Sequence, residues 1–207
     1  MPETAVRIPR TQEERKAESE RRIIRAAMEM FAQQGFMRTT ISEVGKAAGY
    51  TGGLVSHRFG SKEMLLKAVV ERMSSRYLRD QLKPSVVPDD PRRSIEAHVE
   101  AFFTELSARE KSVRALYVVM GEALGAVPEI QSDIAELNRG VRAIWEGTIE
   151  RGKASGVFRA DVDAKAHAVL ILGLLRGITM QAITDKKAFD VKALLPLVKK
   201  QVLASLT

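Results

Sequence analysis

The chain of 207 residues is long enough for one or two domains with a sizeable core, and its hydrophobic content of 45% is ordinary for a globular protein. It has no cysteine, which excludes disulfides, thiol catalysis and zinc sites of the cysteine type. The net charge is +7, and residues 1–72 hold 13 Lys and Arg against 9 Asp and Glu, a density that suits a phosphate-binding surface but that solubility alone also explains.

The N-terminus has neither the apolar core of a signal peptide nor a long apolar run. No apolar run elsewhere approaches the ~20 residues of a membrane span. We therefore expect a soluble, cytoplasmic protein that does not insert into a membrane. Residues 1–10 are expected to form a mobile basic arm, in which Arg7 and Arg10 either reach a minor groove or belong to a plain disordered tail.

The first predicted helix covers residues 12–34. Thr11 and Glu14 have the spacing of a capping box at its start, and Gly35 can end it. Its first half is nearly all charged, while its second half carries apolar residues at helical spacing. We therefore expect the second half to pack against the helices that follow.

Two short helices joined by a turn are predicted next. Thr40 and Glu43 form another capping box, Gly49 can end that helix in the left-handed conformation, and Thr51 can cap the second helix. Gly45 has no side chain, so the second helix can cross the first closely. This is the layout of a helix-turn-helix motif, whose second helix enters the major groove. An ordinary helical hairpin in a core is the alternative.

Three stretches carry a resemblance to a known family. They are AAMEMFAQQGF at 26–36, AAGYTGGLVSHRF at 47–59 and GSKEMLLKAVV at 60–70. Together they resemble the DNA-binding domain of the tetracycline-repressor (TetR) family. The Ser56-His57 pair is similar to the subgroup that includes the repressor of choline-to-betaine genes, and Ser56 stands where most members carry Tyr.

The resemblance and the motif together predict the DNA interface. Ser56 and Arg58 are expected to face DNA, Thr51 to touch a phosphate, and the resemblance implies that Lys62 donates to a phosphate. A solvated surface lysine is the alternative for Lys62. The residues expected at the interface are Thr40, Thr51, Gly52, Gly53, Leu54, Ser56, His57, Arg58 and Lys62.

The rest of the chain also predicts helices. Ser61 can cap a helix that continues to Lys83, where Pro84 breaks it. Later helices are predicted from Pro91 to Ala108, through 113–124, from Pro128, over 164–184 and within 190–206, where Pro196 must kink the helix or mark its start. We therefore predict an all-α protein with a helix-turn-helix DNA-binding domain of residues 11–71 and a ligand-sensing and dimerisation domain of residues 72–207.

The last two predicted helices indicate self-association. They are more apolar than a monomer needs, and Gly173 and Gly177 would let another helix come close. The family resemblance implies a homodimer held by a four-helix bundle of these helices. An intramolecular hairpin packed on the rest of the subunit is the alternative. The residues expected in the dimer interface are Leu170, Gly173, Gly177, Leu197 and Val202.

The family resemblance also implies a small-molecule effector, whose identity the sequence does not show. Aromatic and methionine side chains of the second domain could line an apolar pocket, although such residues are more often core. A choline-like cation would need an aromatic cage, and none can be assembled from this sequence. The pocket candidates are Met73, Tyr77, Phe102, Phe103, Tyr117, Met120, Trp145 and Met180.

No constellation for catalysis or metal binding is recognisable. The three histidines lie far apart, and no H-E-x-x-H, G-x-S-x-G or phosphate-binding Gly-rich loop occurs. We expect no enzyme activity, no metal and no cofactor, and we interpret His98 and His167 as core histidines. The resemblance implies a ligand-responsive transcriptional regulator, a repressor released from a palindromic double-stranded DNA operator by a small molecule. The alternatives are a helical small-molecule-binding protein or enzyme with an incidental helix-turn-helix, and a non-specific architectural DNA binder.

Overall fold

The computed structural model describes residues 11–207, a range that contains helices and no strand. The α-helices are α1 (Gln12–Gln34), α2 (Ile41–Ala48), α3 (Gly52–Phe59), α4 (Lys62–Arg76), α5 (Pro91–Ala108), α6 (Glu110–Ala123), α7 (Gln131–Ala154), α8 (Ala164–Thr184) and α9 (Val191–Ala204). The all-α prediction is confirmed. The expected arm, with Arg7 and Arg10, lies outside the described residues.

The caps predicted for the first helices are confirmed. Thr11 Oγ1 accepts a hydrogen bond from the Glu14 amide at 3.1 Å, and Thr40 Oγ1 accepts one from the Glu43 amide at 3.2 Å. In both boxes the glutamate carboxylate returns a bond to the amide of the threonine. Gly49 ends α2 in the left-handed region, with φ 79° and ψ 31°. The boundaries of α1 and α2 therefore follow from local capping chemistry.

The fourth helix differs from the prediction of one α-helix to Lys83. α4 ends at Arg76, and the chain continues as a π-helical turn (η1, Tyr77–Leu82) and a 3-10 turn (η2, Lys83–Ser85). The wider turn brings Leu78 against α7, where a Cβ on Gly140 would lie only 3.0 Å from Leu78 Cδ1. The glycine thus makes room for the π turn, a feature that is frequent at functional sites.

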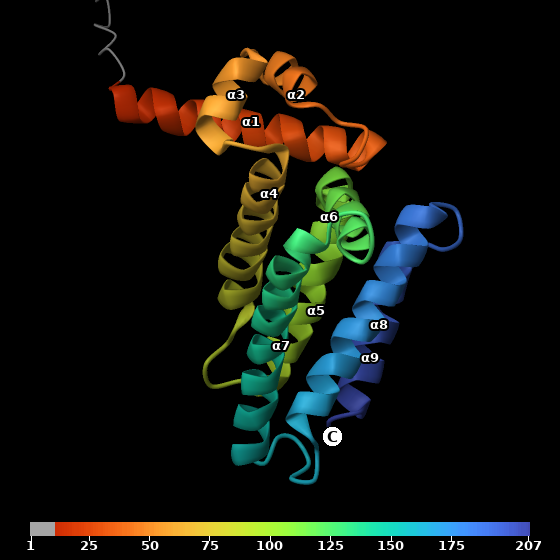
Figure 1. The fold of residues 1–207 in the computed structure, drawn as a ribbon. Helices are drawn as coiled ribbons and strands as arrows, with labels where there is room; N and C mark the ends of the chain where they lie inside the picture. The colour runs from red at the N-terminus through yellow and green to blue at the C-terminus, as the bar shows by residue number, and fades with distance from the viewer. Residues whose placement is uncertain (1–10) are drawn as a thin grey trace, which may run out of the picture.

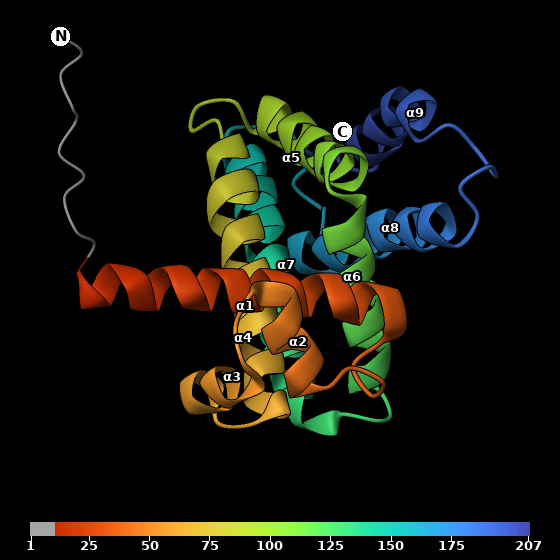
Figure 2. The same ribbon diagram turned by 90° about the horizontal axis from the view of Figure 1, so that it is seen from above.

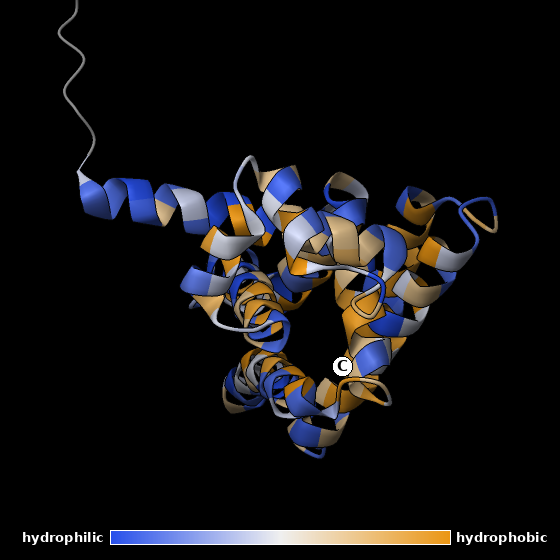
Figure 3. Cartoon of the chain, turned by 45° about the horizontal axis from the view of Figure 1, so that its top comes forward, coloured by the Kyte–Doolittle hydropathy of each residue, from blue (hydrophilic) through white to orange (hydrophobic). Residues whose placement is uncertain are grey.

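The helices form two groups that meet along α1, α4 and α6. α1 lies across one end of the molecule with α2 and α3 packed on it, and α4 runs from this end along the second group (Figure 1). Seen from above, the start of α1 projects beyond the other helices (Figure 2). This projecting half is hydrophilic (Figure 3), as expected from its charged sequence.

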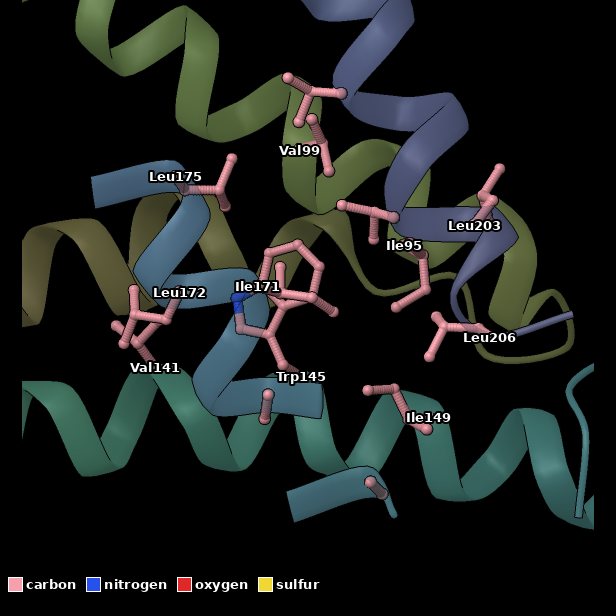
Figure 4. Close-up of a cluster of buried hydrophobic side chains, with 14 of the residues drawn as sticks. Ile95, Val99, Val141, Trp145, Ile149, Ile171, Leu172, Leu175, Leu203 and Leu206 are labelled. Carbon is pink, nitrogen blue, oxygen red and sulfur yellow. The ribbon is translucent and has the colours of Figure 1, made fainter. Parts of the chain in front are cut away.

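Two hydrophobic clusters hold the fold together. The first lies among α5, α7, α8 and α9, with Trp145 at its centre (Figure 4). The second joins α1–α4 but also includes Val119 and Ala123 of α6 and Ile134 of α7. The expected boundary between residues 71 and 72 falls inside α4, so the DNA-binding helices share their core with the second part of the chain. A movement of α6 would therefore also displace α1, which packs against it.

The last two helices correct one expectation and decide between two alternatives. α8 is long and apolar enough to cross a membrane by length and composition alone, with a mean hydropathy of 1.5. In the fold it buries Ile171 and Leu175 in the first hydrophobic cluster. α9 begins at Val191 and includes Pro196, so this proline does not mark its start.

Candidate functional site

α2 and α3 cross as closely as the sequence predicts. A Cβ added to Gly45 would lie 2.8 Å from the backbone nitrogen of Gly52, and one added to Gly52 would lie 3.0 Å from Ser42 Cα. Gly53 has no such contact, since its Cβ would meet only Thr51 Oγ1 at 3.8 Å. Gly45 and Gly52 are therefore packing glycines, whereas Gly53 leaves the first turn of α3 open to a ligand.

α3 has a capped N-terminus and an exposed polar side. Thr51 Oγ1 caps it by accepting from the Leu54 amide at 3.2 Å, and Val55 anchors it in the core. Ser56 and His57 are exposed on its outer side. Thr40, at the start of α2, is exposed as well, so these residues are accessible to a DNA duplex, as a helix in the major groove requires.

Arg58 lies differently from the expectation that it faces DNA beside Ser56. Its side chain is half-buried, and it lines a hollow with residues of the first turns of α1, among them Arg15 and Lys16. The hollow holds three basic residues and one acidic residue, Glu13, an excess of positive charge that favours a phosphate rather than a base edge as the partner of Arg58.

The Lys62 side chain makes contacts inside the subunit, while its donation to a DNA phosphate stays a prediction. Its Nζ donates to the carbonyl oxygens of Phe36 at 3.1 Å, Met37 at 3.4 Å and Thr39 at 3.1 Å, and lies 4.2 Å from the centre of the Phe36 ring. An ammonium group has three donors. All three are directed at the turn between α1 and α2, which Lys62 therefore helps to hold.

A cavity of about 510 Å³ lies between the DNA-binding helices and the second group. This size is within the usual range for small-molecule sites. Residues of α1, α4, η1, α5, α6, α7 and α8 line it, so both parts of the chain contribute. The apolar lining includes Ile24 and Met28 of α1, and Leu137, Val141 and Leu172 from the second part.

Four of the eight predicted pocket residues line this cavity, namely Met73, Tyr77, Phe102 and Tyr117. The other four lie elsewhere. Phe103 and Trp145 are core residues at 4% and 1% exposure, Met120 packs between the two hydrophobic clusters, and Met180 is 50% exposed on the outside of α8. Burial raises the pKa of the Tyr77 and Tyr117 phenols, so both line the cavity as neutral groups.

Sequence reasoning missed the cationic side chains of the cavity. Arg76 pairs with the buried carboxylate of Glu105, and Arg109 Nε lies 3.6 Å from the same carboxylate. Arg176 of α8 is half-buried, and its carbonyl oxygen accepts a hydrogen bond from Tyr117 at 3.3 Å. The available signal was Arg176, because it interrupts the most apolar helix of the chain.

Glu122 ties the DNA-binding helices to α6. Its Oε1 accepts a hydrogen bond from the Phe36 amide at 2.8 Å, just after the end of α1. Its Oε2 is buried without a hydrogen-bond partner among the described residues. α6 also lines the cavity with Leu116 and Tyr117. One helix therefore connects the cavity to the turn before α2.

His98 is a core histidine, as predicted. Its Nδ1 meets Ser85 Oγ, its Nε2 lies 3.1 Å from Thr148 Oγ1, and its ring packs edge-on to Trp145 at 5.0 Å between centroids. Burial lowers the pKa of His98 to about 4. His167 is not a core histidine, contrary to the prediction. It is half-buried at the start of α8, outside the cavity lining, with Nδ1 2.8 Å from the Asp163 carbonyl oxygen.

The predicted dimer residues fall into two groups. Leu170 is 66% exposed and Leu197 is 51% exposed, and Gly173 and Gly177 open to solvent on the same side of α8 as Leu170. Val202 is 2% exposed inside the first hydrophobic cluster, so it belongs to the subunit core and not to a free surface. The prediction that Val202 lies in the dimer interface is therefore wrong.

An exposed helix-turn-helix, joined through a shared core to a helical domain with a cavity, defines the class of a DNA-binding regulator with a sensing domain. The comparisons with known families agree. The model described as "Bacterial regulatory proteins, tetR family" matches residues 23–69, and the one described as "BetI-type transcriptional repressor, C-terminal" matches residues 91–207. The chain belongs to the tetR family, whose members are transcriptional regulators, and it carries a BetI-type C-terminal region.

Relatives support this assignment. The repressor KstR2 of Rhodococcus jostii is 30% identical over 143 residues, which cover 67% of either chain. Among solved structures, the fatty acid degradation regulator FadR of Bacillus halodurans has a TM-score of 0.80 at 22% identity, covering 89% of this chain and 94% of its own. FadR of Bacillus subtilis, in complex with stearoyl-CoA, has a TM-score of 0.79 at 19% identity, covering 90% and 99%. These likenesses confirm the predicted fold, and the family confirms a ligand-responsive DNA-binding regulator.

Proposed function

We propose that this chain acts in the cytoplasm as a homodimer that represses transcription from a palindromic operator and is released when a small molecule fills the cavity. The cavity carries the proposal, because α1 of the DNA-binding part lines it together with α5–α8. An occupant that touches both parts binds one relative arrangement better than another, and this difference is what moves a conformational equilibrium.

The path from the cavity to DNA runs through α4 and α6. α4 contributes Met73 to the lining and begins directly after α3. α6 contributes Leu116 and holds the Phe36 amide through Glu122. A tilt of either helix changes the distance between the two α3 helices of a dimer, which must lie about 34 Å apart, one turn of DNA.

The proposed dimer accounts for the apolar surface of α8 and α9. Val169, Leu170, Leu174, Met180 and Leu197 are all more than 40% exposed. Large exposed side chains gathered along one helix, as Val169, Leu170, Leu174 and Met180 are on α8, are typical of an interaction site. Gly173 and Gly177 lie among them, and a Cβ on either would meet nothing within 4 Å in the same subunit. Space at these glycines is therefore available for a partner helix.

Selection from a random duplex library tests the DNA-binding proposal. We expect enrichment of an inverted repeat bound by one dimer, and a steep loss of affinity with salt. His57→Ala should cost about 1–3 kcal/mol on the selected site and little on random DNA, if His57 reads a base. His167→Ala, the same change at the start of α8, is the matched control and should bind like the parent.

The same binding assay also tests the role of Arg58. Because it lies with the basic residues at the start of α1, we expect Arg58→Ala to weaken selected and random duplexes alike. Failure to enrich any sequence would refute the repressor and leave a non-specific binder. An enriched site without dyad symmetry, bound by a monomer, would refute the dimer.

A further inference from the structure

Arginine side chains dominate the polar lining of the cavity. Six arginines face two glutamates there, so positive charges exceed negative ones by four. The charged residues of the lining are Arg21, Arg25, Arg72, Arg76, Arg109 and Arg176, with Glu20 and Glu105. A lining of this composition raises the local concentration of anions and repels cations.

The carboxylates do not neutralise this excess. Glu105 is 8% exposed and serves two arginines, Arg76 and Arg109, at once. Arg21 pairs with Glu18, outside the lining, but this pair is exposed and therefore weak. The outer arginines, Arg21, Arg25, Arg72 and Arg109, are all exposed at the surface and can meet the part of a ligand that remains in water.

Arg176 lies further inside the cavity, and its guanidinium lacks a partner in the part of the subunit that the structure describes. Within residues 11–207 no carboxylate or hydrogen-bond acceptor pairs with its guanidinium, and the groups that act on its charge are Tyr77, Tyr117 and the like-charged Arg142. Burial lowers the pKa of this guanidinium. A partly buried charge without a partner is costly to the fold, and an anion beside it would remove that cost.

The walls around Arg176 are apolar or aromatic. Leu172 lies one turn before it on α8, and Leu137, Val141 and Phe102 line the same cavity from α7 and α5. Such walls remove an apolar group from water, which stabilises binding. A ligand that fits this cavity would therefore have an apolar part that packs against the walls and a group that pairs with the guanidinium.

We propose that the cavity binds an anionic amphipath, with its apolar part against α5, α7 and α8 and its acidic group at Arg176. This inference rests on the proposed function, because it names the chemical class of the effector. A free carboxylate would pair with Arg176 alone. A phosphate-bearing conjugate of the same acid would also reach the outer arginines. The excess of positive charge in the lining disfavours a choline-like cation.

A matched pair of fluorescent probes tests the charge preference. Anilinonaphthalene sulfonate and the uncharged N-phenyl-1-naphthylamine differ only by the sulfonate. We expect the sulfonate to bind the full-length protein at least tenfold more tightly. Arg176→Gln should weaken the sulfonate about 10- to 100-fold, the usual range for a lost charge-assisted hydrogen bond, and leave the neutral probe unchanged. Arg176→Lys should restore part of the loss.

Arg142→Gln is the control for a general change of potential. Arg142 lies close enough to act on Arg176 but does not line the cavity. We expect its substitution to leave sulfonate binding within a few-fold of the parent. Circular dichroism and thermal unfolding of each variant separate a lost site from a lost fold.

Displacement of the sulfonate then identifies the source of the anion. Straight-chain carboxylates from octanoate to hexadecanoate should compete, and the alcohols of the same length should not. A coenzyme A thioester that competes better than its acid, and loses this advantage in Arg25→Gln/Arg72→Gln, indicates a phosphate-bearing ligand. Equal binding by acid and thioester indicates the carboxylate.

Equal affinity for the charged and neutral probes, or an effect of Arg142→Gln equal to that of Arg176→Gln, would overturn the anionic site. Operator release is measured separately. A neutral or cationic compound that occupies the cavity and releases DNA would overturn this inference and leave the proposed function intact. Anions that bind through Arg176 without changing operator affinity would leave the site intact and overturn the proposed release.

Discussion

Glu122→Ala should uncouple the turn after α1 from α6. Glu122 Oε1 accepts the Phe36 amide at 2.8 Å, and Phe36 is 3% exposed, so the substitution leaves a buried N–H without a partner. Such a loss costs about 1–3 kcal/mol, and we expect about 2 kcal/mol because the acceptor is a carboxylate. For a chain of this length the melting temperature should fall by about 4–8 °C.

Glu122→Gln is the matched control. It keeps an acceptor oxygen for the Phe36 amide and removes a negative charge whose second oxygen is buried without a partner. We therefore expect its stability within about 1 kcal/mol of the parent. Amide hydrogen exchange adds a local reading, because the Phe36 amide should exchange about 30-fold faster in the alanine variant if 2 kcal/mol of local stability is lost.

The same variant tests the route from the cavity to DNA. Operator affinity of the free protein should change little, while the fold-change caused by an effector should shrink, because α6 no longer holds the turn before α2. If the alanine and glutamine variants have the same melting temperature and the same exchange rate at Phe36, the hydrogen bond contributes nothing and this route is wrong.

Four further predictions follow from the packing. Gly45→Ala should lower the free energy of unfolding by about 1–3 kcal/mol, because its Cβ would lie 2.8 Å from backbone atoms, whereas exposed Gly53→Ala should not; denaturant titration compares them. Lys62→Met should lower stability by about 2 kcal/mol in the same titration and leave the salt dependence of DNA binding unchanged, because Nζ already serves three carbonyls. His98 titrates near pH 6.5 when unfolded but near pH 4 when folded, because burial excludes its charge, so stability should fall as the pH drops through this window, by at most about 1.4 kcal/mol per pH unit; His98→Gln should flatten that part of the curve. Gly177→Leu should leave the circular dichroism of the subunit intact, since a Cβ there meets nothing within 4 Å, but weaken the dimer in sedimentation by about 1–3 kcal/mol for each copy of the change; an intact dimer would place α8 outside the interface.

The helix-turn-helix could be predicted from the sequence because its determinants are local. Thr40 and Thr51 cap helices through amides three residues away, and Gly49 ends α2 by its own left-handed backbone. The role of Gly45 could be predicted only by assuming that the next helix crosses at this point, and the helix-turn-helix motif implies that crossing. The same reasoning could not reach Lys62, because its side chain bonds to carbonyls 23 to 26 residues earlier in the chain.

The face of a helix is also harder to predict than its existence. Leu197 and Val202 both belong to the apolar pattern of α9, yet one is 51% exposed and the other 2%. Only the position of α5, which packs along α9, decides between them. Met180 and Tyr77 were equally plausible pocket residues by type, and the fold puts one outside and one inside.

The cavity shows why a ligand class needs the fold while a DNA-binding class does not. Its lining comes from α1, α4–α8 and the turn at Tyr77, so no stretch of sequence contains it. The outer arginines lie on surfaces that the sequence gives no reason to separate from solvated faces. Arg176 alone breaks a pattern, as a charge within an apolar helix, and such a break is costly unless something pairs with it. Because the described residues offer Arg176 no carboxylate, the partner that we propose for it is an anion from outside the subunit.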